Sequence, residues 1–188
     1  QEVELNALQL NKISFSVQPE DASASSIFGA SENILIVSND SGEYYAPNFG
    51  VDLIGDVNSE DGFGVFLSGM DNDMIVIEGL PFDLEVTPLN LDALQMNLVS
   101  YLPQDCMPTE DVFAGYEDNI LIVKNDSGSY YVPAFGVITL AEMCPGDAYE
   151  IFLSGMNGFD FFFPADDMAR SLSSDSQIWL NYTEHSVS

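Results

Sequence analysis

Carboxylates are the side chains that could do chemistry here, because the sequence has 31 Asp and Glu but one His and two Cys. A Ser–His–Asp triad needs a histidine, and His185 lies in a polar segment close to the end of the chain. Too few Cys and His are present for a Cys₂His₂ zinc site or a Cys₄ cluster. Pairs of acids could hydrolyse glycosidic bonds, but small duplicated β units rarely form the deep cleft that this reaction uses. We therefore expect a protein that is not an enzyme.

Calcium is the one cofactor that the side chains suggest. Oxygen ligands are crowded in two stretches, the first with Asp56, Glu60 and Asp61 and the second with Asp71 and Asp73. Carboxylate oxygens of this kind suit Ca²⁺. No stretch matches the twelve-residue calcium loop that lies between two helices. Solvated acidic loops are the alternative interpretation.

The charge balance limits both partners and location. Three Lys and Arg oppose the 31 acids, and the net charge is −28. Nucleic acid binding through a basic face is excluded, and docking on anionic lipid is disfavoured. No apolar run approaches the roughly 20 residues of a membrane-spanning helix, so we expect no membrane insertion. A charge of this size suits high salt, and the start at Gln1 resembles a mature secreted protein or a cloned fragment. We expect an extracellular or cell-surface location.

An internal repeat organises the chain. Asn33–Val37 recurs as Asn119–Val123, and Ile34 and Ile120 give the offset of the repeat (120 − 34 = 86). The same offset relates the Asn-Asp-Ser-Gly stretches at 39–42 and 125–128 and the Phe-Leu-Ser-Gly-Met stretches at 66–70 and 152–156. We predict a first β repeat over residues 1–80, a second over 81–165, and a tail over 166–188 that could add one strand.

Each repeat has the pattern of a small β structure. Ile34–Val37 and Ile120–Val123 are short apolar runs, which predict strands buried on both faces. Further strands are predicted near residues 11–15, 63–67 and 74–77, and at 97–101, 149–153 and 159–163 in the second repeat. Short helical turns are predicted at 24–28 and 110–113. The predicted fold is all-β: two tandem small barrels or sandwiches with short helical turns.

Cys106 and Cys144 both lie in the second repeat, and an even pair in a secreted chain is usually joined, so we predict a disulfide. N-glycosylation triplets begin at Asn39, Asn125 and Asn181 and matter only if the source is eukaryotic. The first two are equally explained as turn residues.

Two tyrosine pairs, Tyr44-Tyr45 and Tyr130-Tyr131, follow these turns. One member of each pair must face away from the core, since successive side chains of a strand point to opposite faces. An outward tyrosine, or Trp179 in the tail, could stack on a sugar or pack against a neighbouring subunit. Packing between neighbouring strands is the alternative.

A repeated motif carries a family resemblance. Asn-x-(Ile/Val)-Ser-aromatic occurs at Asn11–Phe15 and Asn97–Tyr101, and Pro145–Ile151 reads Pro-Gly-acidic-x-aromatic-x-Ile. The pattern resembles the "GWNLIS … PGxGYxI" β-repeats of large secreted and cell-surface proteins of Bacteroidetes-like bacteria. The usual Trp is replaced by Leu10 and Met96, and Glu60-Asp61 stands where Pro-Gly is expected. The resemblance implies adhesive, accessory or structural modules and carries over no catalytic residue.

These patterns together predict a non-catalytic extracellular structural or adhesive protein, a subunit or segment of a fibre or surface assembly. Its expected partners are other copies of itself or other surface proteins. The apolar segments 3–10 and 178–182 would pair as strands between chains. The alternative is a pair of carbohydrate-binding modules that serve a secreted enzyme.

Overall fold

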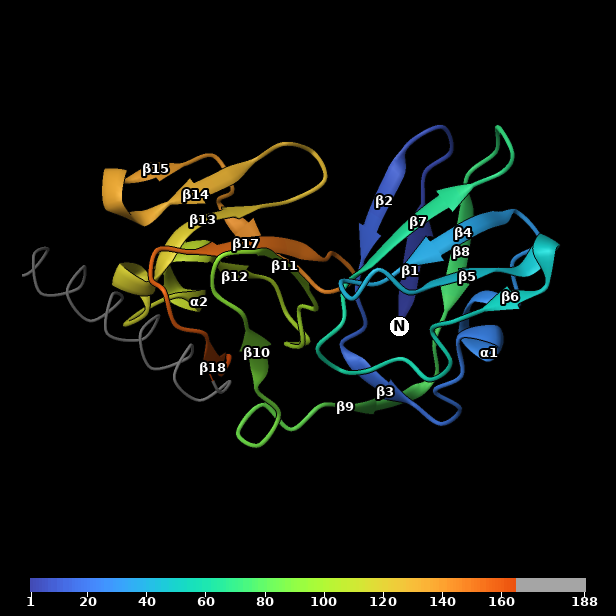
Figure 1. The fold of residues 1–188 in the computed structure, drawn as a ribbon, viewed down its shortest axis with the longest axis horizontal. Coiled ribbons are helices and arrows are strands. Elements are labelled where there is room, and N and C mark those ends of the chain that lie inside the picture. Colours follow the sequence, from blue (N-terminus) through green and yellow to red (C-terminus); the bar gives the residue numbers. More distant parts are fainter. Residues whose placement is uncertain (165–188) are drawn as a thin grey trace, which may run out of the picture.

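A computed structural model describes residues 1–164, so Trp179, Asn181, His185 and the predicted tail strand lie outside the described residues. The fold is all-β with two short α-helices, α1 (Ala24–Phe28) and α2 (Thr109–Val112), where helical turns were predicted. Figure 1 shows two halves side by side along the longest axis, one for each repeat. No helix of residues 1–164 is long and apolar enough to cross a membrane.

Each repeat is built on a five-stranded antiparallel sheet, and the two sheets have the same strand order. In the first repeat the order is β2 (Leu10–Ile13), β7 (Phe63–Leu67), β4 (Ile34–Ser38), β5 (Tyr44–Ala46), β6 (Val51–Asp52). In the second it is β11 (Met96–Val99), β17 (Tyr149–Leu153), β13 (Ile120–Lys124), β14 (Tyr130–Val132), β15 (Val137–Ile138). The two sheets stay open and do not close into barrels, so the barrel alternative was wrong.

Four two-stranded pairs complete the β structure. They are β1 (Glu2–Leu5) with β8 (Asp73–Val76), β10 (Leu89–Leu91) with β18 (Phe159–Phe161), β3 (Val17–Pro19) with β9 (Gly79–Pro81), and β12 (Met107–Pro108) with β16 (Glu142–Met143). Val3 and Leu5 are buried in β1, which pairs with β8 of the same chain. The beginning of the segment predicted to pair between chains is therefore occupied within its own repeat. The predicted boundary after residue 80 falls inside β9.

Strands β4 and β13 differ from the prediction of burial on both faces. Ile34 and Val37 are fully buried, but Ile36 is 37% exposed, as is Leu121 of β13 at 43%. A register shift in each strand, between Ile34 and Ile36 and between residues 120 and 122, explains this pattern. An extra residue in the bulge breaks the alternation and turns a side chain outward.

Each repeat has its own hydrophobic core. Residues between Val3 and Ile77 form the first core, and residues between Leu89 and Phe163 form the second. Phe15, Phe28 and Phe63 meet in the first, with ring centroids 5.4–5.9 Å apart. Two separate cores indicate that the repeats are structural units joined by residues 82–88.

The disulfide between Cys106 and Cys144 is confirmed. It lies beside the short β12–β16 pair, which ties the loop before α2 to the loop before β17. No such cross-link exists in the first repeat, because both cysteines of the chain are in the second.

The 3₁₀ turns η1 (Pro47–Phe49) and η3 (Pro133–Phe135) connect β5 to β6 and β14 to β15. Each ends on a glycine in the left-handed region, Gly50 with φ 65° and Gly136 with φ 59°. Only glycine adopts this conformation at little cost, so the repeated Pro-x-Phe-Gly sequence fixes the same turn twice. A third 3₁₀ turn, η2 (Glu117–Asn119), leads into β13.

Candidate functional site: the junction between the repeats

The two repeats meet through four short backbone segments, which we call the junction. They are residues 12–14 and 60–62 of the first repeat and residues 98–100 and 146–148 of the second. Bridges between Ile13 and Asp147 and between Asp61 and Val99 are antiparallel. The two contacts are equivalent, since exchanging the repeats converts one contact into the other.

Four main-chain hydrogen bonds hold the junction, and they form two equivalent pairs. They are Ser14 N–H to Gly146 O (2.9 Å), Ser100 N–H to Glu60 O (3.1 Å), Ala148 N–H to Lys12 O (3.0 Å) and Gly62 N–H to Leu98 O (3.1 Å). In such an isologous interface, both partners use the same surface. The duplication has therefore produced, within one chain, the contact of a symmetric dimer.

The serine of the repeated motif adds a side-chain bond on each side. The Ser14 hydroxyl donates to the Asp147 carbonyl (2.6 Å), and the Ser100 hydroxyl donates to the Asp61 carbonyl (2.6 Å). Both serines are at most 2% exposed. The Ser14 hydroxyl also accepts from the backbone N–H of Tyr101 (3.0 Å). The motif serine therefore joins the repeats.

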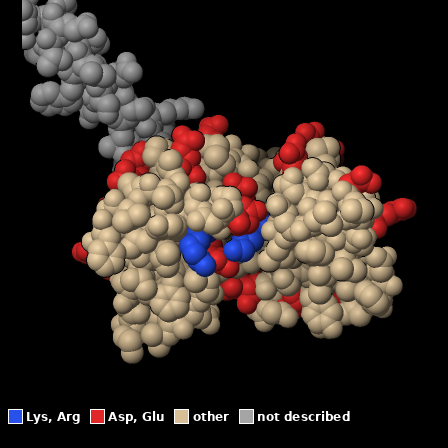
Figure 2. Space-filling model, turned by 90° about the horizontal axis from the view of Figure 1, so that it is seen from above, with Lys and Arg blue, Asp and Glu red and all other residues tan. Residues whose placement is uncertain are grey.

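Both lysines of the chain converge on one carboxylate beside the junction. Lys12 Nζ lies 2.9 Å from Glu150 Oε1, and Lys124 Nζ lies 2.8 Å from Glu150 Oε2. Lys12 comes from the first repeat, so this triad is a charged contact between repeats. Figure 2 shows the basic side chains together between the two halves, with acidic side chains around them.

The triad also sets the ionisation of Glu150. Partial burial would raise the pKa of Glu150, but hydrogen bonds from Lys124 and Lys12 outweigh it and hold the pKa below its usual value. The ion pairs with Lys12 and Lys124 therefore favour the charged carboxylate in the folded state.

Three other acids at or beside the junction have a pKa above its usual value, in contrast to Glu150. Desolvation is the largest cause that raises the pKa of Asp40, Asp61 and Asp147. The Asp40 carboxylate accepts a hydrogen bond from Leu98 N–H (2.8 Å), which offsets part of the rise. Asp61 is half-buried, whereas Asp40 and Asp147 are more exposed, so solvent screens their charges better.

Asp61 gives a testable pH dependence. Its raised pKa means that the folded protein binds this proton more tightly than the unfolded chain does. Its contribution to stability is therefore greatest below the ordinary pKa of 3.8 and is lost as the pH rises through the raised value. We expect Asp61→Asn to raise the melting temperature by a few degrees at pH 7, and to lose this gain near about pH 3.

Asp71→Asn is the matched control for this experiment. Asp71 is exposed in the loop between β7 and β8, and the substitution removes the same charge. Circular dichroism melts of both variants across the pH range make the comparison. Equal gains would assign the effect to general charge repulsion and contradict the role of desolvation at Asp61.

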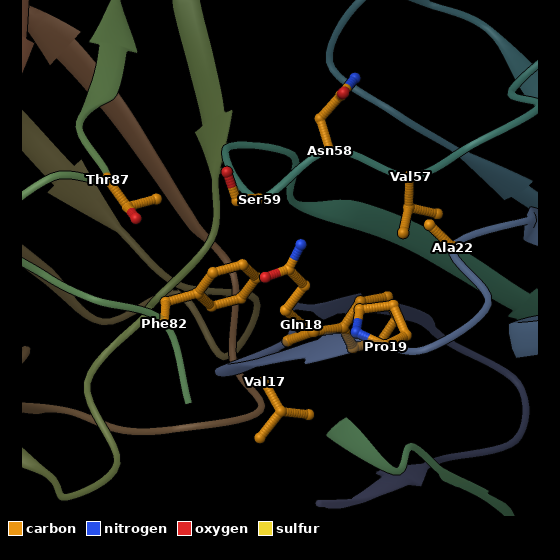
Figure 3. A pocket seen from close by; sticks show the side chains of 10 residues that line it. Val17, Gln18, Pro19, Ala22, Val57, Asn58, Ser59, Phe82 and Thr87 are labelled. Atoms are coloured by element: carbon orange, nitrogen blue, oxygen red, sulfur yellow. The ribbon is translucent and has the colours of Figure 1, made fainter. Parts of the chain in front are cut away.

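A cavity of about 310 Å³ opens beside the junction, between the first repeat and the connection 82–88. Figure 3 shows Phe82 and Thr87 on one side and Ala22 and Val57 on the other. Its polar lining consists of the amides of Gln18 and Asn58 and the hydroxyls of Ser59 and Thr87. An aromatic ring beside amides and hydroxyls suits a small polar ligand such as a sugar.

The acids predicted to bind calcium lie in separate places. Asp73 accepts hydrogen bonds from the Ser31 hydroxyl and from Asn33 Nδ2, which lower its pKa, while Asp71 is exposed in the same loop.

Of the other three predicted calcium ligands, Asp56 lies beside the start of α1, and Glu60 and Asp61 belong to the junction. Asp56 forms a backbone bridge with Ser23, Glu60 accepts from Asn90 N–H (2.9 Å), and Asp61 belongs to the junction. Within residues 1–164, no group of three or more His, Cys, Asp or Glu is placed to hold a metal ion. Calcium binding stays a prediction.

The tyrosine pairs divide between core and surface. Tyr44 and Tyr130 are each 38% exposed, whereas Tyr45 and Tyr131 are buried. The turn asparagines before them bond locally: Asn39 Nδ2 donates to Glu43 Oε2 (3.0 Å), and Asn125 Oδ1 accepts from Ser129 N–H (2.9 Å). These bonds support the interpretation of both asparagines as turn residues.

Residues of the junction were missed as a site by sequence reasoning. The repeat offset relates Ser14 to Ser100 and Gly62 to Ala148, but it does not show that these positions touch across the repeats. The available signal was the scarcity of cations, because two of the three Lys and Arg meet at this place.

Comparisons with known proteins add no relative to this description. The resemblance to secreted bacterial β-repeats therefore stays a prediction. No protein-family model matches the chain, and no curated protein and no solved structure matches it.

Proposed function

We propose that the chain is a non-catalytic extracellular structural or adhesive protein that joins neighbours through a surface repeated at its two ends. One observation carries the proposal. Phe49 and Phe135 occupy equivalent positions in η1 and η3 and are 73% and 79% exposed. The hairpin strands that follow them, β6 and β15, lie at opposite ends of the molecule (Figure 1).

Each phenylalanine is part of a larger apolar surface, which we call an end patch. Tyr44, Phe49 and Leu53 form the first, with Leu53 N–H bonded to Tyr44 O (2.9 Å). The second contains Tyr130, Phe135 and Val137, all at least 37% exposed. Grouped apolar side chains on a surface mark interaction sites. Two end patches make the molecule bivalent, which suits a subunit that links neighbours into a fibre or layer.

The location outside the cell is part of the proposal. The Cys106–Cys144 disulfide supports an oxidising compartment. The net charge of −28 supports surroundings of high ionic strength, since repulsion between copies is screened there. The proposed partners are other copies of the chain or other proteins of the same surface.

Carbohydrate binding is the second candidate, favoured by the cavity with Phe82. Its amides and hydroxyls could bond sugar hydroxyls while the ring covers an apolar sugar face. The chain would then be an accessory module pair of a secreted enzyme.

Self-association separates the two candidates. In high salt, we expect the chain to associate as its concentration rises, and Phe49→Ser with Phe135→Ser to raise the dissociation constant at least about tenfold. Analytical ultracentrifugation measures both. Met70→Ser with Met156→Ser is the matched control, because these methionines are also equivalent and 80% and 75% exposed, but lie in other loops. A chain that stays monomeric at every concentration, and binds oligosaccharides in titration calorimetry, would favour the second candidate.

A further inference from the structure

We propose that the junction is a recognition surface specific for the unlike repeat. The partner that it fits is the second repeat for the first repeat, on the same chain or on another copy, and pairs of like repeats are excluded. This inference concerns the junction alone and does not depend on the end patches.

Hydrogen bonding at the junction does not itself choose between like and unlike pairs. All four main-chain bonds are made by segments that both repeats possess, and both motif serines donate across the junction. A pair of first repeats or a pair of second repeats could form the same bonds. Selectivity must come from side chains that differ between the repeats.

Packing between Gly62 and Ala148 is the first such difference. These two positions are equivalent in the repeats and face one another. A Cβ atom added to Gly62 would lie 2.8 Å from the Ala148 Cβ and 3.0 Å from both Leu98 Cγ and the Val99 carbonyl oxygen. Real Cβ atoms essentially never lie closer than 3.0 Å to another heavy atom, so the contact with Ala148 is a clash and the other two are tight. Two second repeats would place alanine against alanine here and clash, whereas two first repeats would leave a gap.

Charge at the junction is the second difference. Lys12 faces Glu150 in the observed pair, and the equivalent positions on the other side are Leu98 and Gly64, which carry no charge. A pair of first repeats would set both copies of Lys12 opposite Gly64, without the carboxylate of Glu150. A pair of second repeats would set Glu150 opposite Leu98. Only the unlike pair joins Lys12 to Glu150. A pair of second repeats would keep the Lys124–Glu150 ion pair, whereas a pair of first repeats would leave Lys12 without a carboxylate in a partly buried contact, which is unfavourable.

A cleavable connection tests the proposal on the full chain. The turn at residues 83–86 suits a protease recognition sequence, because Val86 is 71% exposed and its backbone N–H bonds locally, to the Asp83 carbonyl of the same turn. The disulfide lies within the second repeat, so it does not link the halves after cleavage. We expect the cleaved halves to stay together as a one-to-one pair in native mass spectrometry.

Mixing isotope-labelled and unlabelled cleaved protein tests the specificity. Halves should exchange into labelled–unlabelled pairs of first with second repeat, and no pair of like repeats should form. Gly62→Ala should raise the dissociation constant of the halves at least about tenfold. Adding Ala148→Gly should lower the dissociation constant again by at least about threefold, because it removes the closest of the three contacts while Leu98 and the Val99 carbonyl stay in place.

Gly155→Ala is the matched control, since no atom lies within 4 Å of an added Cβ there. Circular dichroism of each variant checks that both repeats remain folded. Separation of the halves after cleavage, formation of like pairs, or an equal effect of Gly62→Ala and Gly155→Ala would overturn the proposal. Failure of Ala148→Gly to rescue Gly62→Ala would overturn the packing argument in the same way.

Discussion

Replacing Cys106 and Cys144 with Ser should lower the free energy of unfolding by about 4 kcal/mol. The disulfide joins positions 38 residues apart. Its removal raises the conformational entropy of the unfolded chain, because the closed loop no longer restricts it, and this lowers the free energy of unfolding. The loss should fall on the second repeat. Urea denaturation followed by circular dichroism gives the total, and hydrogen exchange locates it.

The first repeat is the internal control for this result. It has no cysteine and a separate core, so amide protection in β4 and β7 should change little, while protection in β13 and β17 falls. Reduced wild-type protein should behave like the double variant. A loss below about 1 kcal/mol would contradict a stabilising role for the disulfide.

Asn97→Ala should cost about 3 kcal/mol. The Asn97 side chain is 3% exposed, and it accepts from Asp92 N–H (2.8 Å) and donates to the carbonyls of Asp92 (3.0 Å) and Ile151 (3.0 Å). These bonds close the loop around Leu94, whose φ of 65° is unusual for leucine. Alanine would leave three backbone groups without this partner, and chemical denaturation measures the loss.

Asn11→Ala tests the same contact in the first repeat, where Asn11 bonds Asn6 and Val65 in the equivalent way. Asn90→Ala is the control, because Asn90 is exposed and its side chain makes a single bond to Asp160. The control should stay within about 0.5 kcal/mol of wild type. An Asn97→Ala variant as stable as the Asn90→Ala variant would contradict the structural role of the motif asparagine.

Much of the fold could be predicted because the duplication gives two copies of each sequence pattern, and the copies can be compared. A short run such as Ile34–Val37 is ambiguous alone, but its recurrence beside the same turn and the same tyrosine pair indicates a β-hairpin. The disulfide could be predicted because the chain has two cysteines and both lie in the second repeat. The exposure of Ile36 could not be predicted, since a one-residue bulge reverses which face a side chain occupies and leaves no mark in the composition.

The junction could not be predicted from the sequence, for a different reason. Its backbone bonds involve no particular side chain, and the Lys12–Glu150 contact spans more than a hundred residues. The motif residues that suggested a family of secreted β-repeats have structural roles in this chain: Asn11 closes a loop, Ser14 bonds across to Asp147, and Phe15 lies in the core. A short motif repeated in a fold can therefore reflect folding and pairing constraints.

The ion pairs of both lysines with Glu150 also limit where proteases can cut the folded protein. Proteases of the trypsin type cut after Lys or Arg, and the whole sequence contains three such residues, with Arg170 outside the described region. Lys12 and Lys124 lie in strands β2 and β13, and their side chains are 16% and 37% exposed. A protease cannot bind an extended segment around either lysine until the sheet and the triad open, because strand residues are already paired. Cleavage by such a protease at Lys12 is thereby tied to opening of the contact between the two repeats, and cleavage at Lys124 to opening of the second sheet.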